Sequence, residues 1–202
     1  MTARDPVHVT LIGADYSVYS RICRLALRLK RVPHHFEPLD VFAPDGPGRA
    51  RAAGHPFGKI PLLRHGPLTL HETLAITRYI DQAFDGPPLE PADPALRARM
   101  NQIVSIVDTG VYPIIVWGLH VPKSKGLEPD PGMIAKARTV LGALEALALG
   151  PWLCGEAQSL ADAYLAACMD YVADSAVGEA LPDLCPRLAR WRLQAGTLPP
   201  FA

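Results

Sequence analysis

Val-His-Val-Thr-Leu-Ile-Gly at residues 7–13 precedes Val-Tyr-Ser-Arg-Ile-Cys-Arg-Leu-Ala-Leu-Arg-Leu at residues 18–29. These two stretches indicate how the first half of the chain folds. The first run is short, rich in β-prone residues and closed by a glycine, which is typical of a strand. In the second run apolar residues recur at helical spacing, at Val18, Ile22, Leu25, Ala26 and Leu29. We therefore expect a strand followed directly by a helix.

The pattern continues outward from this unit. Pro33 marks the end of the helix and a second strand is expected over about residues 34–40, followed by a Pro-, Gly- and Ala-rich loop to about residue 54. Ile60–Leu63 and Leu68–Leu70 indicate an antiparallel hairpin, and a helix is expected to begin near Glu72 or Thr73. The predicted order is β-α-β, loop, β-β-α.

A polar, proline-rich segment at residues 85–94 has the composition of a linker between two cores. We predict one domain over residues 1–84 and a second over residues 95–202. The second shows helical periodicity throughout, with helices expected at 95–119, 132–149, 159–174 and 186–195. Gly110 and Pro113 predict a bend near residues 109–113. Ser159-Leu160-Ala161-Asp162 has the form of a capping box at a helix start.

Composition excludes several classes of protein. Hydrophobic residues make up 49% of the 202, enough for a substantial core, and 20 Lys and Arg balance 20 Asp and Glu. We therefore expect neither a nucleic-acid partner nor a membrane surface as partner. No uninterrupted run of about 18 apolar residues and no apolar leader is seen, so we expect a cytoplasmic protein. The four cysteines form no C-x-x-C pair, so we expect no metal site and no disulfide framework, only reduced packing residues.

Three motifs occur in a fixed order along the chain. They are Ser17-Val18-Tyr19-Ser20-Arg21 at the first helix start, His55-Pro56-Phe57-Gly58-Lys59-Ile60-Pro61, and His71-Glu72-Thr73-Leu74-Ala75-Ile76 before a helix. Together with the capping box they resemble the glutathione transferases, and more closely the serine-type, bacterial-like members. The resemblance covers the whole chain. It implies a thioredoxin-like N-terminal domain that binds glutathione, an all-helical C-terminal domain, and a glutathione pocket between the two.

The resemblance also implies how glutathione is held. The bond before Pro61 would be cis, so that the backbone of Ile60 pairs with the cysteinyl part of the tripeptide. Thr73 would bind the γ-glutamyl carboxylate at a helix N-terminus, and Glu72 its ammonium group. Lys59 would contact the tripeptide backbone. From the residues alone, an ordinary trans proline, a Thr73 helix cap with a Glu72 first-turn charge, and a solvated lysine remain open.

Ser17 matches the active serine of the serine-type members. Its hydroxyl would donate a hydrogen bond to the glutathione sulfur and stabilise the thiolate without a covalent intermediate. A serine in this place can also be a simple helix cap. Tyr16 and Tyr19 flank it, and either phenol could supply the hydrogen bond or merely line the pocket. Thr10 stands where the tyrosine-type members have their active hydroxyl, so that mechanism is not expected.

The predicted activity is conjugation of glutathione, as co-substrate, to small hydrophobic electrophiles in detoxification. Tyr112, Val116 and Trp117, near the expected bend, are candidates for the electrophile pocket or for ordinary core. Two other functions stay open. One is a glutathione-dependent isomerase or peroxidase, although Ser17–Ser20 lacks the cysteine of the zeta-type isomerases. The other is a non-catalytic glutathione-binding or protein-interaction module. The resemblance further implies a homodimer.

Overall fold

The computed structural model describes residues 8–199, and they divide into two compact units. The first unit runs to Leu89 and the second spans Glu90–Leu198. The division falls inside the proline-rich segment 85–94. Each unit is described by itself below.

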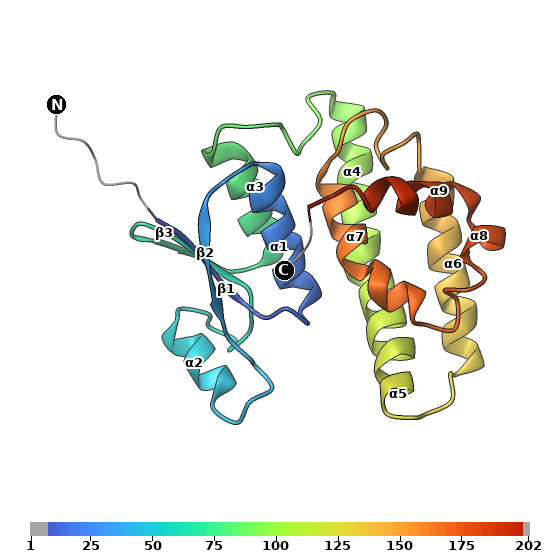
Figure 1. Cartoon of the computed structure of the whole chain (residues 1–202), viewed down its shortest axis with the longest axis horizontal. Helices are drawn as coiled ribbons and strands as arrows, with labels where there is room; N and C mark the ends of the chain where they lie inside the picture. The colour runs from blue at the N-terminus through green and yellow to red at the C-terminus, as the bar shows by residue number, and fades with distance from the viewer. Residues whose placement is uncertain (1–7, 200–202) are drawn as a thin grey trace. The chain divides into compact units, whose positions relative to one another are not determined.

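The first unit is a four-stranded mixed sheet with helices (Figure 1). The strand order is β2-β1-β3-β4, with β1 parallel to β2 and antiparallel to β3, and β3 antiparallel to β4. Helices α1 and α3 pack against each other. This is the thioredoxin-like domain that the sequence predicts. Its elements are β1 (Val9–Gly13), α1 (Val18–Leu29), β2 (His34–Pro38), α2 (Gly46–Ala52), β3 (Leu62–His65), β4 (Leu68–Leu70) and α3 (Thr73–Ala83).

Helix α2 corrects the sequence prediction, which gave a loop from about residue 41 to 54. Its proline lies in the first turn, where a missing N–H costs no intrahelical hydrogen bond. Arg49 and Arg51 lie in its last turn, where cations are favourable. Ala50 is fully buried in a cluster with Ile12, Leu39 and Leu62. Burial of Ala50 in the tertiary structure therefore stabilises a helix that the Gly- and Pro-rich sequence does not predict.

The second unit is helical, as predicted, and the only β-pairing in its described residues is an isolated bridge between Trp152 and Gly155. The short helices α5 and α8 were not predicted. The elements are α4 (Pro94–Ile106), η1 (Val107–His120), α5 (Val121–Ser124), α6 (Pro131–Leu147), α7 (Leu160–Ala173), α8 (Leu181–Leu184) and α9 (Pro186–Ala195).

Residues 94–124 form one continuous helical stretch, and its middle part η1 is wound as a π-helix. Pro113 lies inside η1. The interruption predicted near residues 109–113 therefore takes the form of π-helical winding, in which hydrogen bonds join residues five positions apart instead of four. By length and composition alone this stretch could cross a membrane; the core helix of a soluble protein passes the same test. The stretch packs against α6 and α7, and 44% of its most apolar window is buried.

Asp162 is the polar centre of the second unit. Its carboxylate is fully buried and completes the predicted capping box, because Oδ2 accepts hydrogen bonds from the Ser159 amide at 2.8 Å and hydroxyl at 2.9 Å. Oδ1 accepts from the amide of Leu153 at 2.9 Å and from the indole N–H of Trp191 on α9 at 2.8 Å. Burial raises the pKa of this carboxyl, and the four donors oppose that rise. One side chain thus joins α7, α9 and the preceding loop.

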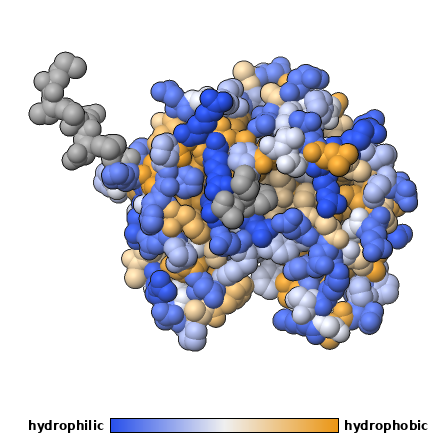
Figure 2. Space-filling model, in the orientation of Figure 1, coloured by the Kyte–Doolittle hydropathy of each residue, from blue (hydrophilic) through white to orange (hydrophobic). Residues whose placement is uncertain are grey.

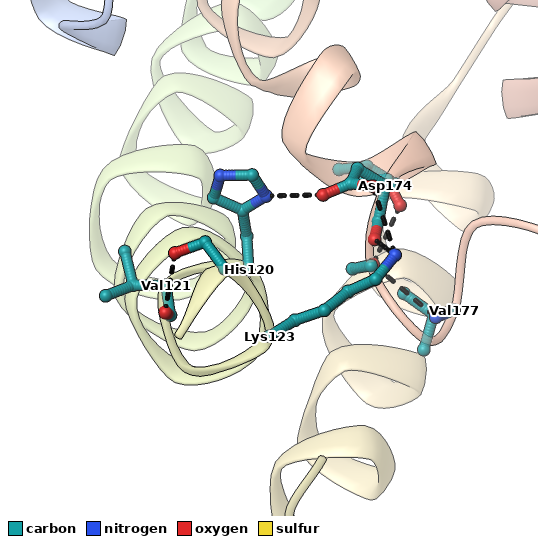
Figure 3. Close-up of polar contacts among 8 residues, drawn as sticks. His120, Val121, Lys123, Asp174 and Val177 are labelled. Atoms are coloured by element: carbon teal, nitrogen blue, oxygen red, sulfur yellow. Dashed lines mark hydrogen bonds and ion pairs between the residues drawn. The ribbon is translucent and has the colours of Figure 1, made fainter. Parts of the chain in front are cut away.

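A second polar cluster joins the far end of η1 to the end of α7 (Figure 3). Asp174, which caps α7, lies 2.9 Å from Nδ1 of His120 and 3.0 Å from Nζ of Lys123. The His120 ring also meets the edge of Tyr171, with centroids 4.8 Å apart. The Lys123 hydrogen bond is the main cause that lowers the pKa of Asp174. Nothing in the local sequence around His120 predicts this cluster.

On the face shown in Figure 2, apolar side chains lie in scattered patches among hydrophilic ones. All four cysteines are buried and free, as the sequence predicts. Among the described residues of the first unit, the most exposed large apolar side chains are Phe42 and Phe57, at 68% and 64% exposure.

Replacing Asp162 by alanine leaves two buried amides and the Trp191 indole N–H without an acceptor. We expect the free energy of unfolding to fall by at least about 3 kcal/mol, because each buried unpaired donor costs about 1–3 kcal/mol. Denaturant titration measures the loss. Asp183→Ala, at an exposed position on α8, is the control and should change stability by less than about 0.5 kcal/mol. A loss for Asp162→Ala no larger than that of the control would contradict the role of Asp162.

Replacing Asp174 by asparagine should lower the melting temperature slightly at neutral pH, since exposed ion pairs contribute little. The pKa of Asp174 is depressed in the folded state, so its contribution is present above the unfolded pKa and is lost as pH falls through the folded value. The difference between wild type and variant should therefore persist down to about pH 4 and shrink below it. Thermal unfolding across this range measures the effect, and a difference that grows on acidification would refute it.

Candidate functional site

The sheet register brings three predicted site segments to one edge. Ile12 at the end of β1 lies opposite Leu62 at the start of β3, and Leu63 lies opposite Leu70 at the end of β4. The segment after β1, the segment before β3 and the segment after β4 therefore share this edge of the sheet. These segments carry, respectively, Tyr16 and Ser17; Lys59, Ile60 and Pro61; and Glu72 and Thr73.

The Ile60–Pro61 peptide bond is cis, which confirms what the family resemblance implied. Ile60 is partly buried and packs against the apolar cluster that contains Ala50 of α2, whereas Lys59 is exposed. Within residues 8–199, the backbone N–H and C=O of Ile60 form no hydrogen bond with other backbone groups. A short extended peptide could use these groups in strand-like pairing.

Glu72 has a backbone conformation that is rare for a residue with a side chain, with φ 68° and ψ 117°. Strain of this kind costs on the order of 1–3 kcal/mol and concentrates at functional sites. Glu72 occupies the N-cap position of α3, and its side chain makes no capping hydrogen bond. Thr73 is the first helical residue and is 9% exposed. The alternative reading, in which Thr73 caps the helix and Glu72 is a first-turn charge, is therefore wrong.

Ser17 is the N-cap of α1, and its Oγ accepts a hydrogen bond from the Ser20 amide at 3.2 Å. A capping serine uses a lone pair, so its own proton remains available for donation. Among the described residues, no acceptor takes that proton. Capping and hydrogen-bond donation to a ligand are thus compatible at Ser17.

Tyr16 has its phenol proton already committed. Its hydroxyl donates to Oδ1 of Asp40 at 2.6 Å and accepts from the Val41 amide at 3.2 Å. Partial burial and the Asp40 hydrogen bond raise the pKa of Tyr16 to about 12. Its ring lies 5.3 Å from that of Phe42. Tyr16 therefore ties the loop after β2 to the start of α1. Tyr19 lies in the first turn of α1 and is partly buried.

The turn before Ser17 is stabilised by contacts of Ser20 and Arg24, two residues that were not predicted from the sequence to belong to the site. The Ala14 amide donates to Oγ of buried Ser20 at 3.2 Å, and Gly13 leaves the space that Ser20 fills, since a Cβ there would lie 2.4 Å from that oxygen. Arg24 pairs with the Asp15 carboxylate and lies 4.1 Å over the Phe36 ring. The sequence offered two signals of this arrangement: Gly13 before the turn, and Ser20 and Arg24 one helical turn apart in α1.

The predicted electrophile-pocket residues lie on η1 in the second unit. Val116 is buried, at 6% exposure, whereas Trp117 is 46% exposed. The rings of Tyr112 and Trp117 meet edge to face with centroids 6.4 Å apart. Sequence reasoning missed Asp108 in the first turn of η1. Its Oδ1 is buried and has no hydrogen-bond partner within residues 8–199, and burial raises the pKa of Asp108 to about 6.

A cavity of about 670 Å³ in the second unit contains none of the predicted site residues. It is lined by Ala148, Leu149, Gly150, Pro151, Arg187, Arg190, Trp191 and Gln194. The sheet edge of the first unit, in contrast, combines backbone groups without backbone partners, the strained Glu72 and a hydroxyl proton available for donation. Within residues 8–199, no group of three or more His, Cys, Asp or Glu side chains could hold a metal ion.

Comparisons with known proteins identify similar sequences and structures. The family profile described as the glutathione S-transferase N-terminal domain matches residues 11–88. The probable maleylacetoacetate isomerase 2 of Drosophila melanogaster is 29% identical over 159 residues, covering 74% of this chain and 70% of the relative. Glutathione S-transferase Z2 of Arabidopsis thaliana is 29% identical over 161 residues, covering 75% and 72%.

Solved structures extend the likeness over the full length. Glutathione transferase F7 from Populus trichocarpa superimposes with a TM-score of 0.77 at 26% identity, covering 96% of this chain and 95% of that one. A glutathione S-transferase from Pseudomonas fluorescens reaches a TM-score of 0.80 at 23% identity, which shows a shared fold. The motifs, the cis proline, the sheet edge and these matches together show that the chain belongs to the glutathione transferase family.

Proposed function

We propose that this chain binds glutathione at the shared sheet edge of its first unit and transfers it to small hydrophobic electrophiles. One observation carries the proposal. The register of β1, β3 and β4 places Ser17, Ile60 and Thr73 at a single edge of the sheet. These residues offer a hydroxyl proton, unpaired backbone groups and a helix N-terminus.

Each part of glutathione has a matching group. The γ-glutamyl carboxylate binds at the N-terminus of α3, where the Thr73 hydroxyl and the first helix amides donate. Glu72, exposed beside it, takes the ammonium group. The backbone of Ile60 pairs with the cysteinyl residue, and exposed Lys59 contacts the tripeptide backbone.

Ser17 is the proposed donor to sulfur. A free thiol has a pKa near 8.5, and lowering it by about two units requires roughly 2.7 kcal/mol of preferential thiolate stabilisation. The Ser17 hydroxyl and the amides at the start of α1 supply positive potential at the sulfur. The thiol proton leaves to solvent, and the thiolate attacks an electrophilic carbon to form a carbon–sulfur bond while the leaving group departs with its electron pair. Tyr112, Val116 and Trp117 are proposed to line the electrophile's side.

A second candidate activity is glutathione-dependent isomerisation. It is favoured by relatives described as maleylacetoacetate isomerases, from Drosophila melanogaster and from Rattus norvegicus, each 29% identical. Against it, Ser17-Val18-Tyr19-Ser20 lacks a cysteine. Glutathione-dependent peroxide reduction and a non-catalytic glutathione-binding module are further alternatives. A cytoplasmic, detoxifying homodimer is proposed on family membership.

Calorimetric titration with glutathione tests binding, and turnover separates the activities. The protein should bind glutathione and accelerate its addition to an activated aryl chloride more than it accelerates cis–trans isomerisation of maleylacetoacetate. Binding without turnover of either substrate would favour the non-catalytic module. Absence of glutathione binding would overturn the proposal as a whole.

Replacing Ser17 by alanine should raise the pKa of bound glutathione by about one to two units and lower kcat/KM by about 10- to 100-fold, because one unit corresponds to a factor of ten. Ultraviolet absorbance of the thiolate, followed against pH, measures the pKa. Tyr16→Phe and Tyr19→Phe are matched variants. Tyr16→Phe should leave the thiol pKa unchanged, because that phenol already donates to Asp40. A shift in a tyrosine variant and none in Ser17→Ala would assign the donor to the phenol.

A further inference from the structure

His55 lies at the start of the turn that carries Lys59, Ile60 and Pro61, and its side chain is 3% exposed. Its backbone amide donates to the carbonyl of Ala50 in α2 at 2.9 Å, and its carbonyl accepts from Gly58 at 3.0 Å. Its ring Nδ1 lies 3.3 Å from the Phe57 amide, which donates to it. The backbone of His55 therefore connects the turn to α2, and its imidazole binds the amide of Phe57 in the same turn.

The same ring also meets the second half of the site. The rings of His55 and His71 lie with centroids 5.1 Å apart, and His71 directly precedes Glu72. His71 is partly exposed, and among the described residues its ring has no hydrogen-bond partner. His55 is thus the side chain through which the turn before β3 meets the turn after β4.

The hydrogen bond from Phe57 requires a neutral ring. An imidazole accepts at Nδ1 only in the tautomer that carries its proton on Nε2, and a protonated imidazole is a donor at both nitrogens. Burial is the main cause that lowers the pKa of His55, and the charges of His71 and Lys59 lower it further, while Glu72 opposes them. Arg51 of α2, a further cation, lies against Gly58 in the same turn. The surroundings therefore favour the accepting form.

We propose that His55 is a positioning residue of the glutathione site, which holds the cis-proline turn through its neutral ring and releases it when the ring is protonated. This inference rests on the proposed function, because it concerns the same glutathione site. Protonation replaces the Phe57 hydrogen bond by a donor facing a donor and adds a cation beside His71 and Lys59. The turn that carries Ile60 then loses the hydrogen bond between Phe57 and His55, so the affinity for glutathione falls at low pH.

The direction with pH follows from linkage. A histidine whose folded pKa is depressed contributes stability that is complete above its unfolded pKa of about 6.5 and is lost as pH falls through the folded value. Affinity that requires the neutral ring should fall as pH drops through the pKa of His55 in the free, folded protein, which lies below the unfolded value. S-methylglutathione is the suitable probe, because it has no thiol whose own ionisation could alter binding.

Calorimetric titration of the full chain with S-methylglutathione from about pH 8 to about pH 5 tests the proposal. In wild type the affinity should fall on acidification, by about tenfold in total for each unit by which the pKa of His55 differs between bound and free protein. In His55→Asn the side-chain oxygen can accept the same amide without titrating, so affinity near neutral pH should be kept and the acid loss should disappear. In His55→Ala the acceptor is gone, and affinity should be reduced at every pH.

Two further variants sharpen the assignment. His35→Asn, at an exposed position on β2, should keep the wild-type pH profile. His71→Asn removes an electrostatic contribution that lowers the pKa of His55, so the acid loss should begin at higher pH. Nuclear magnetic resonance of wild type gives a readout independent of ligand and of variant folding: the Phe57 amide should shift with the same midpoint as the His55 ring.

The outcomes separate the two proposals. No binding of S-methylglutathione at any pH would overturn glutathione binding itself. Binding whose pH profile is flat in wild type, or whose acid loss persists in His55→Asn, would overturn the role of His55 and leave glutathione binding intact. A Phe57 amide that does not titrate with His55 would do the same.

Discussion

The antiparallel pairing of β1 with β3 is the constraint on which the proposed site depends. With Ile12 opposite Leu62, the end of one strand and the start of the other fall at the same sheet edge, and β4 ends there too. A shift of one residue would turn every side chain of β3 to the opposite face. It would exchange the places of buried Leu63 and a neighbour, bringing either partly exposed Arg64 into the core or Leu63 out of it. Core packing thereby fixes the relative positions of Ser17, Ile60 and Glu72.

Polar contacts beneath that edge decide which groups remain free for a ligand. The phenol of Tyr16 is committed to Asp40, Ser20 is buried under the turn, and Asp15 is held by Arg24. The Ser17 proton and the Ile60 backbone groups are left without protein partners in the described chain. Their position at one edge, together with the strained Glu72, supports the proposed glutathione site.

The second unit is organised by buried and long-range polar contacts around a long apolar helix. Asp162 joins α7 to α9 and to the loop before α7, and Asp174 joins the end of α7 to His120 and Lys123 (Figure 3). The π-helical winding of η1 accommodates Pro113 without ending the helix. The residues proposed to face the electrophile therefore lie on a helix whose winding is irregular and whose far end is clamped.

Local chemistry made several features predictable: the strand and helix periods, the capping box at Ser159 and the burial of the cysteines. The order of the motifs indicated the family, and only the resemblance to that family implied the cis bond before Pro61. The tertiary structure alone decided what depends on distant residues. Helix α2 is stabilised by burial of Ala50 against Ile12 and Leu62, and the phenol of Tyr16 is occupied by Asp40, 24 positions away. The contact of His55 with His71 likewise joins two turns that only the sheet brings together. Such contacts leave no periodic signal, because their energy comes from groups that become neighbours only after the chain has folded.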